Sequence, residues 1–524
     1  MATPKGFAKV IIVLTTISAA IMELVDTTII NVALRDMSGS LGVSIEDISW
    51  VITSYAIANV IIIPLTGFLG EYFGRKNYYL VSILLFTVAS YFCGQSHNLL
   101  ELIVWRFIQG IGGGALLSTS QAILFDAFEP KDRGKAAGMF GMGIILGPTL
   151  GPTLGGYILQ NYDWSYIFSI NIPIGIIAFA LAYIFIDRKE NEGKNKASIK
   201  IDYTGILTLM IGISCLQYVL ERGVSEDWFE SEVIRICSIT AAVFLVFFVW
   251  YELRIKQPAV NVRLLGNRNL AFTTIFTFVA GFGLFTSVFV YPLLAQVVLG
   301  FTPYETGLSL LAPTLAGVII MPIMGVMLSK GVTPVPFIAI GFVLFACYSF
   351  LNATVSPDIG RGDLFFIFIL RALGIAMVQL PLINQAVAGL HPKDYATGIG
   401  LNNMMRQIGG AFGIAMANNY IANHVAQHRN DLVSNMQGVA ERQAVLAQGI
   451  MARTGDIATV ANNKALSIIS RTVDQQAYYL SYLDTFRFIG IFFIVVLPFI
   501  LFLRTKKKSA AEIAMATKAA AEAH

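Results

Sequence analysis

Apolar runs long enough to cross a bilayer recur along the whole chain, separated by short polar breaks. A helix needs about 20 mostly apolar residues to cross the hydrocarbon core. The first run, residues 10–34, reads VIIVLTTISAAIMELVDTTIINVAL. The pattern predicts about fourteen transmembrane helices, at residues 10–34, 48–70, 78–96, 99–125, 135–159, 166–187, 202–221, 232–254, 270–297, 305–329, 333–352, 363–388, 395–421 and 480–504.

Composition points the same way. The 524 residues are 56% hydrophobic and only 13% charged, whereas a soluble domain of this length needs a more charged surface. The four cysteines lie in apolar segments without metal-ligand spacing, so we interpret them as packing residues. Because no small-residue cleavage site follows the first run, we interpret it as a retained span and not a signal peptide. We expect an all-α polytopic membrane protein.

Charge in the loops predicts the orientation. Basic residues fall in every second loop, whereas the intervening loops are acidic or neutral, as in the run Glu226, Asp227, Glu230 and Glu232. The positive-inside rule then places both termini in the cytoplasm, which requires an even number of spans. The basic positions include Lys5, Lys9, Arg75, Lys76, Lys131, Arg133, Lys135, Arg188, Lys189, Arg254, Lys256, Arg263, Lys330, Lys393 and Arg504.

Three segments are too polar to cross the membrane. Residues 188–200 form a predicted cytoplasmic linker, and residues 505–524 a predicted cytoplasmic tail. Residues 424–476 form a predicted external loop, whose Ala- and Gln-rich pattern indicates an amphipathic helix plus loop. This loop is either a tolerated insertion or a docking surface for a periplasmic partner.

The first span carries two carboxylates, Glu23 and Asp26. Residues three apart share one face of a helix, and a carboxylate inside a bilayer is costly unless it has a use. Two such groups together in an apolar environment favour binding a proton. They are therefore candidates for proton binding. The alternative is that both only pair with basic partners in a polar cavity.

An arginine occurs within an apolar span in each half of the chain: Arg106 in LIVWRFIQGIGGG and Arg371 in IFILRALGIAMV. If the spans 202–221 and 232–254 are an insertion, both arginines lie in the fourth helix of a six-helix repeat. Repeated halves with a site near the bilayer midplane are typical of transporters. The predicted units are residues 1–187, the linker 188–200, two inserted helices in 201–254, a second bundle in 255–504, and the tail 505–524.

Residues 67–80, GFLGEYFGRKNYYL, place glycines and charges between the second and third spans. Gly67 and Gly74 allow close helix approach, and Glu71, Arg75 and Lys76 can form an ionic contact. The segment resembles the major facilitator superfamily signature G-x-L-A-D-R-x-G-R-K-x-x-x-L, with Glu71 at the usual Asp. The resemblance implies gating by pairing with a neighbouring helix end. Retention of basic residues in the cytoplasm is the simpler alternative.

The fifth span, GMFGMGIILGPTLGPTLGGY, is rich in glycine and proline. A helix interior tolerates this composition where a neighbour packs closely or the helix bends. It resembles the antiporter signature G-x8-G-x3-G-P-x2-G-G, which implies a pliable helix that closes the pathway against leak. An ordinary packing face is the alternative. The matching residues are Gly138, Gly147, Gly151, Pro152, Gly155 and Gly156.

Residues 24–34, LVDTTIINVAL, resemble the L-D-x-T-x-x-N-x-A-L-P signature of the fourteen-helix drug:proton antiporters, with Arg35 at the usual Pro. The segments WVITSYAIANVIIIPLTG and LERGVSEDWF are similar to the same subfamily, closest to EmrB-like exporters. The resemblance implies a major facilitator fold of two six-helix bundles plus two inserted helices. It also implies that Arg106 couples proton movement to Asp26, our first-choice pair, with Glu23 as a second acid.

Candidate substrate contacts come from both halves. Aromatic residues crowd the ninth span, and a wide apolar pocket with few polar anchors suits hydrophobic cargo of many shapes. Arg371 and Arg406 are candidates for a role in the second half. The other candidates are Asn31, Gln109, Phe282, Tyr291, Asn384, Gln385 and Asn402.

We expect a proton-coupled antiporter that exports hydrophobic drugs across the bacterial inner membrane by alternating access. The alternative is an exporter of a specific metabolite, siderophore or fatty acid on the same scaffold. An enzyme or receptor is more remote, since the sequence shows no His/Asp metal cluster, nucleotide-binding glycine loop or Ser/His pair at the membrane face. We expect no cofactor and no metal. The EmrB-like resemblance implies a membrane-fusion adaptor and an outer-membrane channel as partners.

Overall fold

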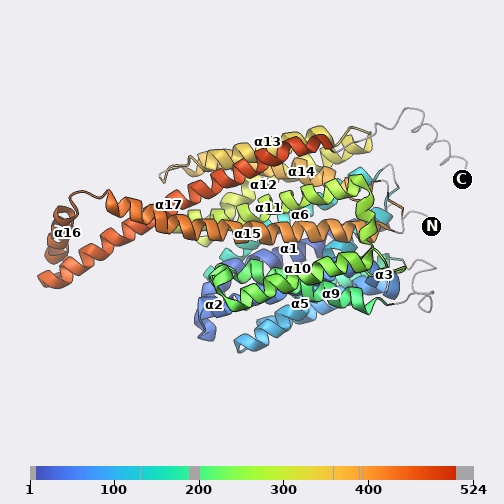
Figure 1. Cartoon of the computed structure of the whole chain (residues 1–524), viewed down its shortest axis with the longest axis horizontal. Coiled ribbons are helices and arrows are strands. Elements are labelled where there is room, and N and C mark those ends of the chain that lie inside the picture. The colour runs from blue at the N-terminus through green and yellow to red at the C-terminus, as the bar shows by residue number, and fades with distance from the viewer. Residues whose placement is uncertain are drawn as a thin grey trace, which may run out of the picture.

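The computed structural model describes residues 7–129, 132–187, 201–357, 359–388, 390–391 and 394–502. In these ranges the chain is almost entirely helical and contains no strand. Long helices run side by side, and two of them continue into a hairpin at one end (Figure 1). The predicted linker 188–200 and tail 505–524 lie outside the described residues.

The first half of the chain forms one bundle. Its helices are α1 (Phe7–Leu41), α3 (Trp50–Phe73), α4 (Arg75–Gly94), α5 (Leu99–Asp126), α6 (Arg133–Asn161) and α8 (Asn171–Phe185), with the short helices α2 (Ile45–Ile48) and α7 (Tyr166–Ser169). Within the bundle α1 packs against α5, α6 and α8, and α5 packs against α3 and α4.

The second half forms a matching bundle from α11 (Arg268–Leu293), α12 (Pro303–Ser329), α13 (Val335–Asn352), α14 (Arg361–Gln385), α15 (Tyr395–Ser434) and α17 (Ala458–Val496). A π-helical turn, η5 (Leu294–Val298), extends α11, and two 3-10 turns, η4 (Val262–Gly266) and η7 (Leu497–Phe502), flank the bundle. The halves meet where α6 packs along α12 and α3 along α15.

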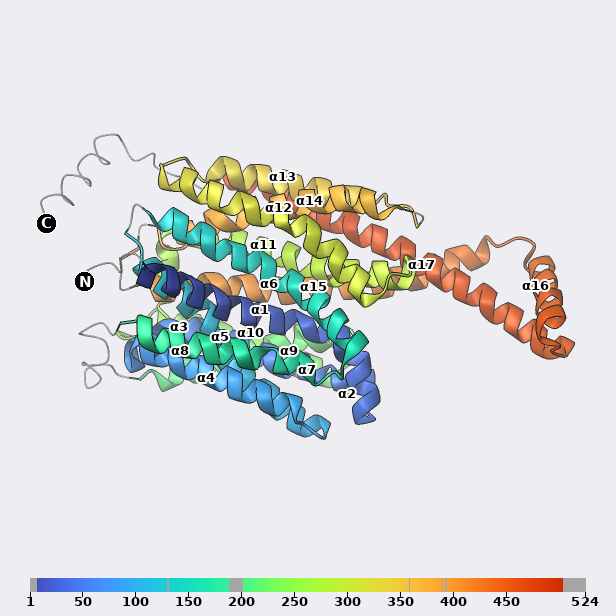
Figure 2. The same ribbon diagram turned by 180° about the vertical axis from the view of Figure 1, so that it is seen from behind.

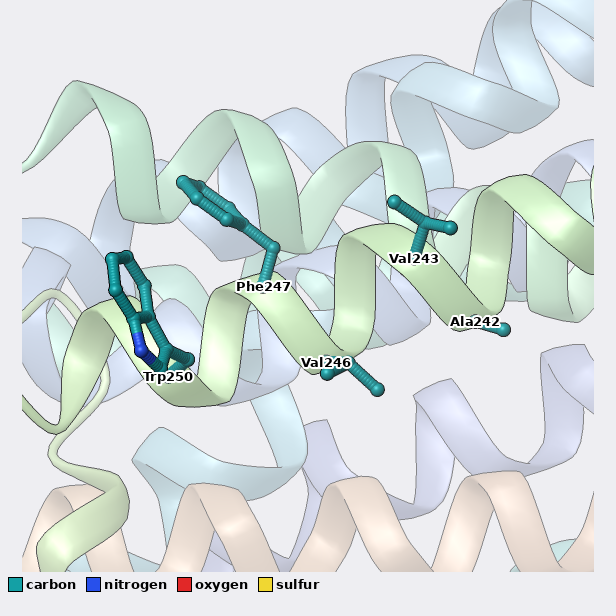
Figure 3. Close-up of a pocket in the computed structure, with 5 residues that line it drawn as sticks. All are labelled: Ala242, Val243, Val246, Phe247 and Trp250. Carbon is teal, nitrogen blue, oxygen red and sulfur yellow. The ribbon is translucent and has the colours of Figure 1, made fainter.

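The two inserted helices, α9 (Tyr203–Arg222) and α10 (Glu232–Glu252), lie beside the bundles and are joined by the turn η3 (Trp228–Glu230). Helix α9 packs against α3 and α15, so it contacts both halves. Helix α10 is peripheral, and a shallow apolar depression lies along its outer side (Figure 3). We interpret that face as lipid-facing; its residues are Ala242, Val243, Val246, Phe247 and Trp250.

Each predicted span corresponds to a helix, with most ends displaced by a few residues. Thirteen helices in the described residues are long and apolar enough to cross a membrane. The fourteenth, α15, is too polar to meet that criterion, yet it packs within the bundle against α3, α11 and α17. Its polar residues Asn402, Asn403 and Arg406 are buried there, so its low apolar content reflects internal contacts.

The structure differs from the prediction of a helix plus loop at residues 424–476. Helix α15 continues to Ser434, α16 spans Val439–Thr454, and α17 already begins at Ala458. The three helices form a hairpin that projects beyond both bundles (Figures 1 and 2). Ala- and Gln-rich sequence favours helix, and Arg429 pairs with Asp474 at 2.8 Å across the two long arms.

The hairpin distinguishes the two ends of the molecule. Helix α1 begins, and η7 ends, at the end opposite to the hairpin (Figures 1 and 2). We call these the hairpin end and the terminal end. An even number of crossings is needed to bring both described ends of the chain to one side.

Candidate functional site

Asp26 lies fully buried at the centre of a hydrogen-bonded network in the first bundle. Arg106 Nη1 on α5 donates to Asp26 Oδ2 at 2.6 Å. Gln109 Nε2 and Asn171 Nδ2 donate to Asp26 Oδ1 at 3.0 and 2.8 Å. The fully buried carboxylate therefore accepts hydrogen bonds from three side chains of two other helices, one of them from a charged donor, which is the stronger kind of hydrogen bond.

The partners of Asp26 are themselves held in place. Ser90 Oγ accepts from Gln109 at 3.1 Å and from Asn171 at 3.0 Å. Arg106 Nε donates to the carbonyl of Val51 at 3.3 Å, and its guanidinium lies 4.1 Å from the centroid of the Tyr55 ring. The pair is fixed by contacts that all lie within the first half.

Glu23, one turn earlier on α1, has a different environment. It is 3% exposed, and its Oε1 accepts from Asn59 Nδ2 of α3 at 3.0 Å. Its Oε2 is buried without a hydrogen-bond partner among the described residues. Its charge interacts with that of Arg406 of α15, in the other half, and with that of Asp26 on the same helix. Arg406 is 2% exposed, and its Nε and Nη1 also lack partners among the described residues.

More polar contacts surround this meeting of the halves. Asn403 Nδ2 of α15 donates to Ser118 Oγ at 3.1 Å and to Gln121 Oε1 at 3.3 Å, both on α5. Asn402 Oδ1 accepts from Thr277 of α11 at 2.8 Å, within the second half. The central part of α15 therefore presents neighbouring polar residues to both bundles.

The glycine-rich helix α6 packs closely against α1. A Cβ atom at Gly151 would overlap Thr28, and one at Gly147 would overlap Leu24. Gly155 likewise leaves no space for a Cβ atom beside α1. These contacts lie on the same stretch of α1 that carries the two carboxylates, so the glycines fix the distance of that stretch from α6.

The same helix also packs closely against α12 in the other half. A Cβ atom at Gly138 would lie 2.9 Å from the carbonyl oxygen of Met321, and one at Gly156 would lie 2.8 Å from the nitrogen of Tyr304. Pro152 is buried within α6. The five glycines of the antiporter signature therefore lie at contacts of α6 with α1 and α12, where there is no room for a larger side chain.

The segment 67–80, at the end of α3 and the start of α4, contacts the other half through Gly67, where a Cβ atom would lie 2.7 Å from Thr397 Oγ1. Gly74 joins the two helices with φ +84°, a backbone conformation that favours glycine. Gly67 therefore allows close approach of α3 to the other half, and Gly74 allows the sharp turn between α3 and α4.

The charged residues of that segment contact neighbouring helix ends. Arg75 pairs with Asp126 at the end of α5, and Lys76 Nζ donates to the carbonyl of Tyr183 at 2.7 Å. Glu71 is exposed. These two contacts lie within the first half, at the terminal end.

Two aromatic candidates pack within the second bundle. The Phe282 ring centroid lies 4.4 Å from that of Phe492, and Tyr291 OH shares a 2.6 Å hydrogen bond with Ser309 Oγ. Both are almost completely buried. The structure does not bring them to Glu23 and Arg406; it places them in the core between α11 and its neighbours.

Arg371 occupies the position in the second half that Arg106 occupies in the first, but without an acid. Its Nε donates to Ser287 Oγ at 2.9 Å, and it forms no ion pair with any described residue. Its Nη2 is buried without a described partner. The two halves therefore share the arginine and differ in its counter-charge.

The other candidates are scattered. Gln109 belongs to the Asp26 network, and Gln385 Oε1 accepts from Asn269 at 2.6 Å. Asn384 is half-buried and Asn31 is exposed. In the described parts of the chain, no group of three or more His, Cys, Asp or Glu residues is placed to hold a metal ion.

Sequence reasoning missed Asn59 and Asn171, which donate to Glu23 and Asp26, and Ser90, which accepts from two partners of Asp26. Each is an isolated polar residue within an apolar span, and such residues mark internal contacts in membrane helices. That signal was present in the sequence. It identifies positions that face the bundle interior, but not the partner that each one contacts.

Two helical bundles of matching arrangement, with buried charged residues in both, are typical of secondary transporters. The sequence profile of the Major Facilitator Superfamily matches residues 16–414. The chain belongs to this superfamily.

Comparisons with characterised proteins agree. The chain is 32% identical to the multidrug export protein EmrB of Haemophilus influenzae, over 82% of this chain and 84% of that protein. It is 30% identical to the fatty acid resistance protein FarB of Neisseria gonorrhoeae, over 95% and 96% of the two chains. The fold resembles the human organic anion transporter TETRAN (TM-score 0.57, 15% identity, 93% of this chain and 99% of that one). It also resembles the proton:xylose symporter XylE (TM-score 0.53, 15% identity, 94% and 96%).

Proposed function

We propose that this protein is a transporter, not an enzyme, that exports hydrophobic drugs or toxic compounds across the bacterial inner membrane in exchange for protons. The similarity to EmrB supports the cargo class. The observation that carries the proposal is the electrostatic interaction of Glu23 with Arg406 across the two halves. Each of the two side chains also has buried polar atoms without a hydrogen-bond partner among the described residues. No cofactor is needed, because the proton gradient supplies the free energy.

Glu23 is the proton carrier in this proposal, and Asp26 is a fixed charge. A proton on Glu23 removes the negative charge that faces Arg406, which weakens the attraction between the halves. Protonation shifts the equilibrium between the inward- and outward-facing states, and the size of the shift is set by the difference in proton affinity of the two states. Asp26 keeps its arginine throughout, because both belong to the same bundle.

The terminal end lies in the cytoplasm and the hairpin end in the periplasm in this proposal, as the positive-inside rule predicts. The hairpin then projects towards the outer membrane, where a membrane-fusion adaptor and an outer-membrane channel can complete the export route. Its two long helical arms provide the docking surface.

A second candidate is the export of an amphipathic carboxylate such as a fatty acid. The similarity to FarB supports it, and so does Arg406, whose buried guanidinium has two groups free of described partners. An acidic cargo fits such a guanidinium. Competition between a fatty acid and unrelated neutral or cationic drugs for the purified protein separates the two candidates: a promiscuous site binds all of them.

Proton release from the purified protein on addition of drug tests the proposal. We expect release in the wild type and in Asp26→Asn if that variant folds, and no release in Glu23→Gln although drug still binds. Release that persists in Glu23→Gln and disappears in Asp26→Asn would instead assign the proton to Asp26. Wild-type protein that binds drug in buffer without any proton release would contradict proton exchange at this site.

A further inference from the structure

The turn between α9 and α10 contacts both halves at the hairpin end. On one side, Arg222 Nη1 donates to Ser49 Oγ, at the start of α3. The Arg222 guanidinium also lies 5.3 Å from the centroid of the Trp50 ring. On the other side, Trp228 Nε1 donates to Asn419 Oδ1 of α15 at 2.9 Å. One short turn therefore connects the two helices that approach each other across the halves.

The backbone of this turn is held in an unfavourable conformation. Asp227 and Trp228 both have φ +52°, in the left-handed region, which is unfavourable for a bulky side chain such as that of Trp228. Among the described residues other than glycine, they are the only two with positive φ. Strain of this kind persists only where surrounding contacts determine the conformation.

Those contacts fix the indole of Trp228. Its backbone N–H donates to the carbonyl of Gly223 at 2.7 Å, and a Cβ atom at Gly223 would lie 2.8 Å from the ring. Glu226 braces the turn by accepting from Tyr218 OH at 2.5 Å and from Ser231 Oγ at 3.2 Å. The turn thus places the indole N–H against α15 while Arg222 stays on α3.

We propose that residues 222–231 form a latch between the two halves at the hairpin end, and that Trp228 is its positioning residue. The proposal rests on alternating access, in which the halves separate at one end at a time. Separation of α3 from α15 at the hairpin end must break the bond to Asn419, the bond to Ser49, or both. The inserted helices therefore regulate opening of that end instead of only adding lipid-facing surface.

Cysteine reporters at the two ends of the α6–α12 contact test the latch. Near the hairpin end, Gly307 packs on Thr153; near the terminal end, Gly134 packs on Ser329. Thr153→Cys and Ser329→Cys are prepared separately in a background in which the four native cysteines are serine. Each is labelled with a polar maleimide in detergent, without drug or proton gradient, so that the test does not depend on cargo or coupling.

We expect Trp228→Phe, which keeps the ring and removes its N–H, to accelerate labelling of Thr153→Cys about five-fold, the effect of one hydrogen bond. Labelling of Ser329→Cys should stay constant or slow down. Asn419→Leu should have the same effect, and the double variant should add nothing further. Asn418→Leu, at the exposed neighbouring position of α15, is the control and should change neither rate.

Unchanged labelling of Thr153→Cys in both Trp228→Phe and Asn419→Leu would overturn the latch. Equal acceleration at both reporters would also overturn it, because it would indicate general loosening of the fold. Neither result would contradict proton-coupled export, which the proton-release experiment tests separately.

Discussion

Asp26 and Glu23 lie one turn apart on α1, but the two carboxylates have opposite surroundings. Asp26 accepts hydrogen bonds from Arg106, Gln109 and Asn171, all within its own half. Glu23 accepts one from Asn59, and its opposing charge, Arg406, belongs to the other half. A fully bonded charge resists change, whereas a partly bonded charge between two moving bodies can respond to a proton or a ligand. These surroundings support the proposal that Asp26 has a structural role and that Glu23 binds the coupled proton.

The largest effect on stability should come from breaking the Asp26 pair. Arg106→Leu leaves Asp26 buried without its counter-charge, which costs about 3–5 kcal/mol. We expect a strongly lowered melting temperature in detergent. Arg406→Leu is the matched control in the other half and should cost much less, because Arg406 makes fewer hydrogen bonds. Equal losses in the two variants would contradict the distinction between the sites.

A smaller loss should follow from disturbing the contact that positions the acidic stretch of α1. Gly151→Ala forces Thr28 and α1 away from α6, and overpacking of this kind costs about 1–3 kcal/mol. Gly70→Ala is the control, since nothing lies within 4 Å of a Cβ atom there. The melting temperature and the transport rate should both fall in Gly151→Ala, and neither should change in Gly70→Ala. If both alanines were tolerated, the close approach of α6 would not be required.

Glu23→Gln should barely change stability, within about 1 kcal/mol, and yet remove proton coupling. Glutamine keeps an oxygen for Asn59 but cannot carry the charge that faces Arg406. Drug transport in proteoliposomes should lose its dependence on an imposed pH gradient, while binding in detergent is retained. If transport by Glu23→Gln still depended on the pH gradient, another acidic residue would be the proton-binding group.

Much of the fold was readable from the sequence, because span length and loop charge depend on local composition. The helices of both bundles, the inserted pair and the Asp26–Arg106 pairing were expected, and the structure places that pair in contact. The hairpin and the internal contacts of α15 were harder to predict from the sequence. A helix outside the membrane and a helix with buried polar residues both lack a strongly apolar sequence pattern. The interaction of Arg406 with Glu23 depends on how α15 of one half is placed relative to α1 of the other, which no local sequence pattern specifies.

The smallest effect is expected at Asp456, a third acid that lies in the hairpin. It accepts hydrogen bonds from Lys464 Nζ at 2.7 Å and from Thr454 Oγ1 at 2.6 Å, and these lower the pKa of the Asp456 carboxyl below its usual value of 3.8. Because the pKa of Asp456 is lower in the folded than in the unfolded protein, the contact stabilises the turn fully at pH values above the pKa of the unfolded state. This stabilisation is lost as the pH falls through the pKa of the folded state.

Asp456→Asn should therefore increase hydrogen exchange only around residues 454–464, and only at pH values at which the wild-type carboxyl is ionised. Below its pKa the two proteins should have equal protection factors. Transport should be unchanged, because an exposed ion pair stabilises only its own turn and contacts neither half. A loss of export in this variant comparable to that of Glu23→Gln would instead place the tip of the hairpin in the transport route, with the adaptor as its expected contact.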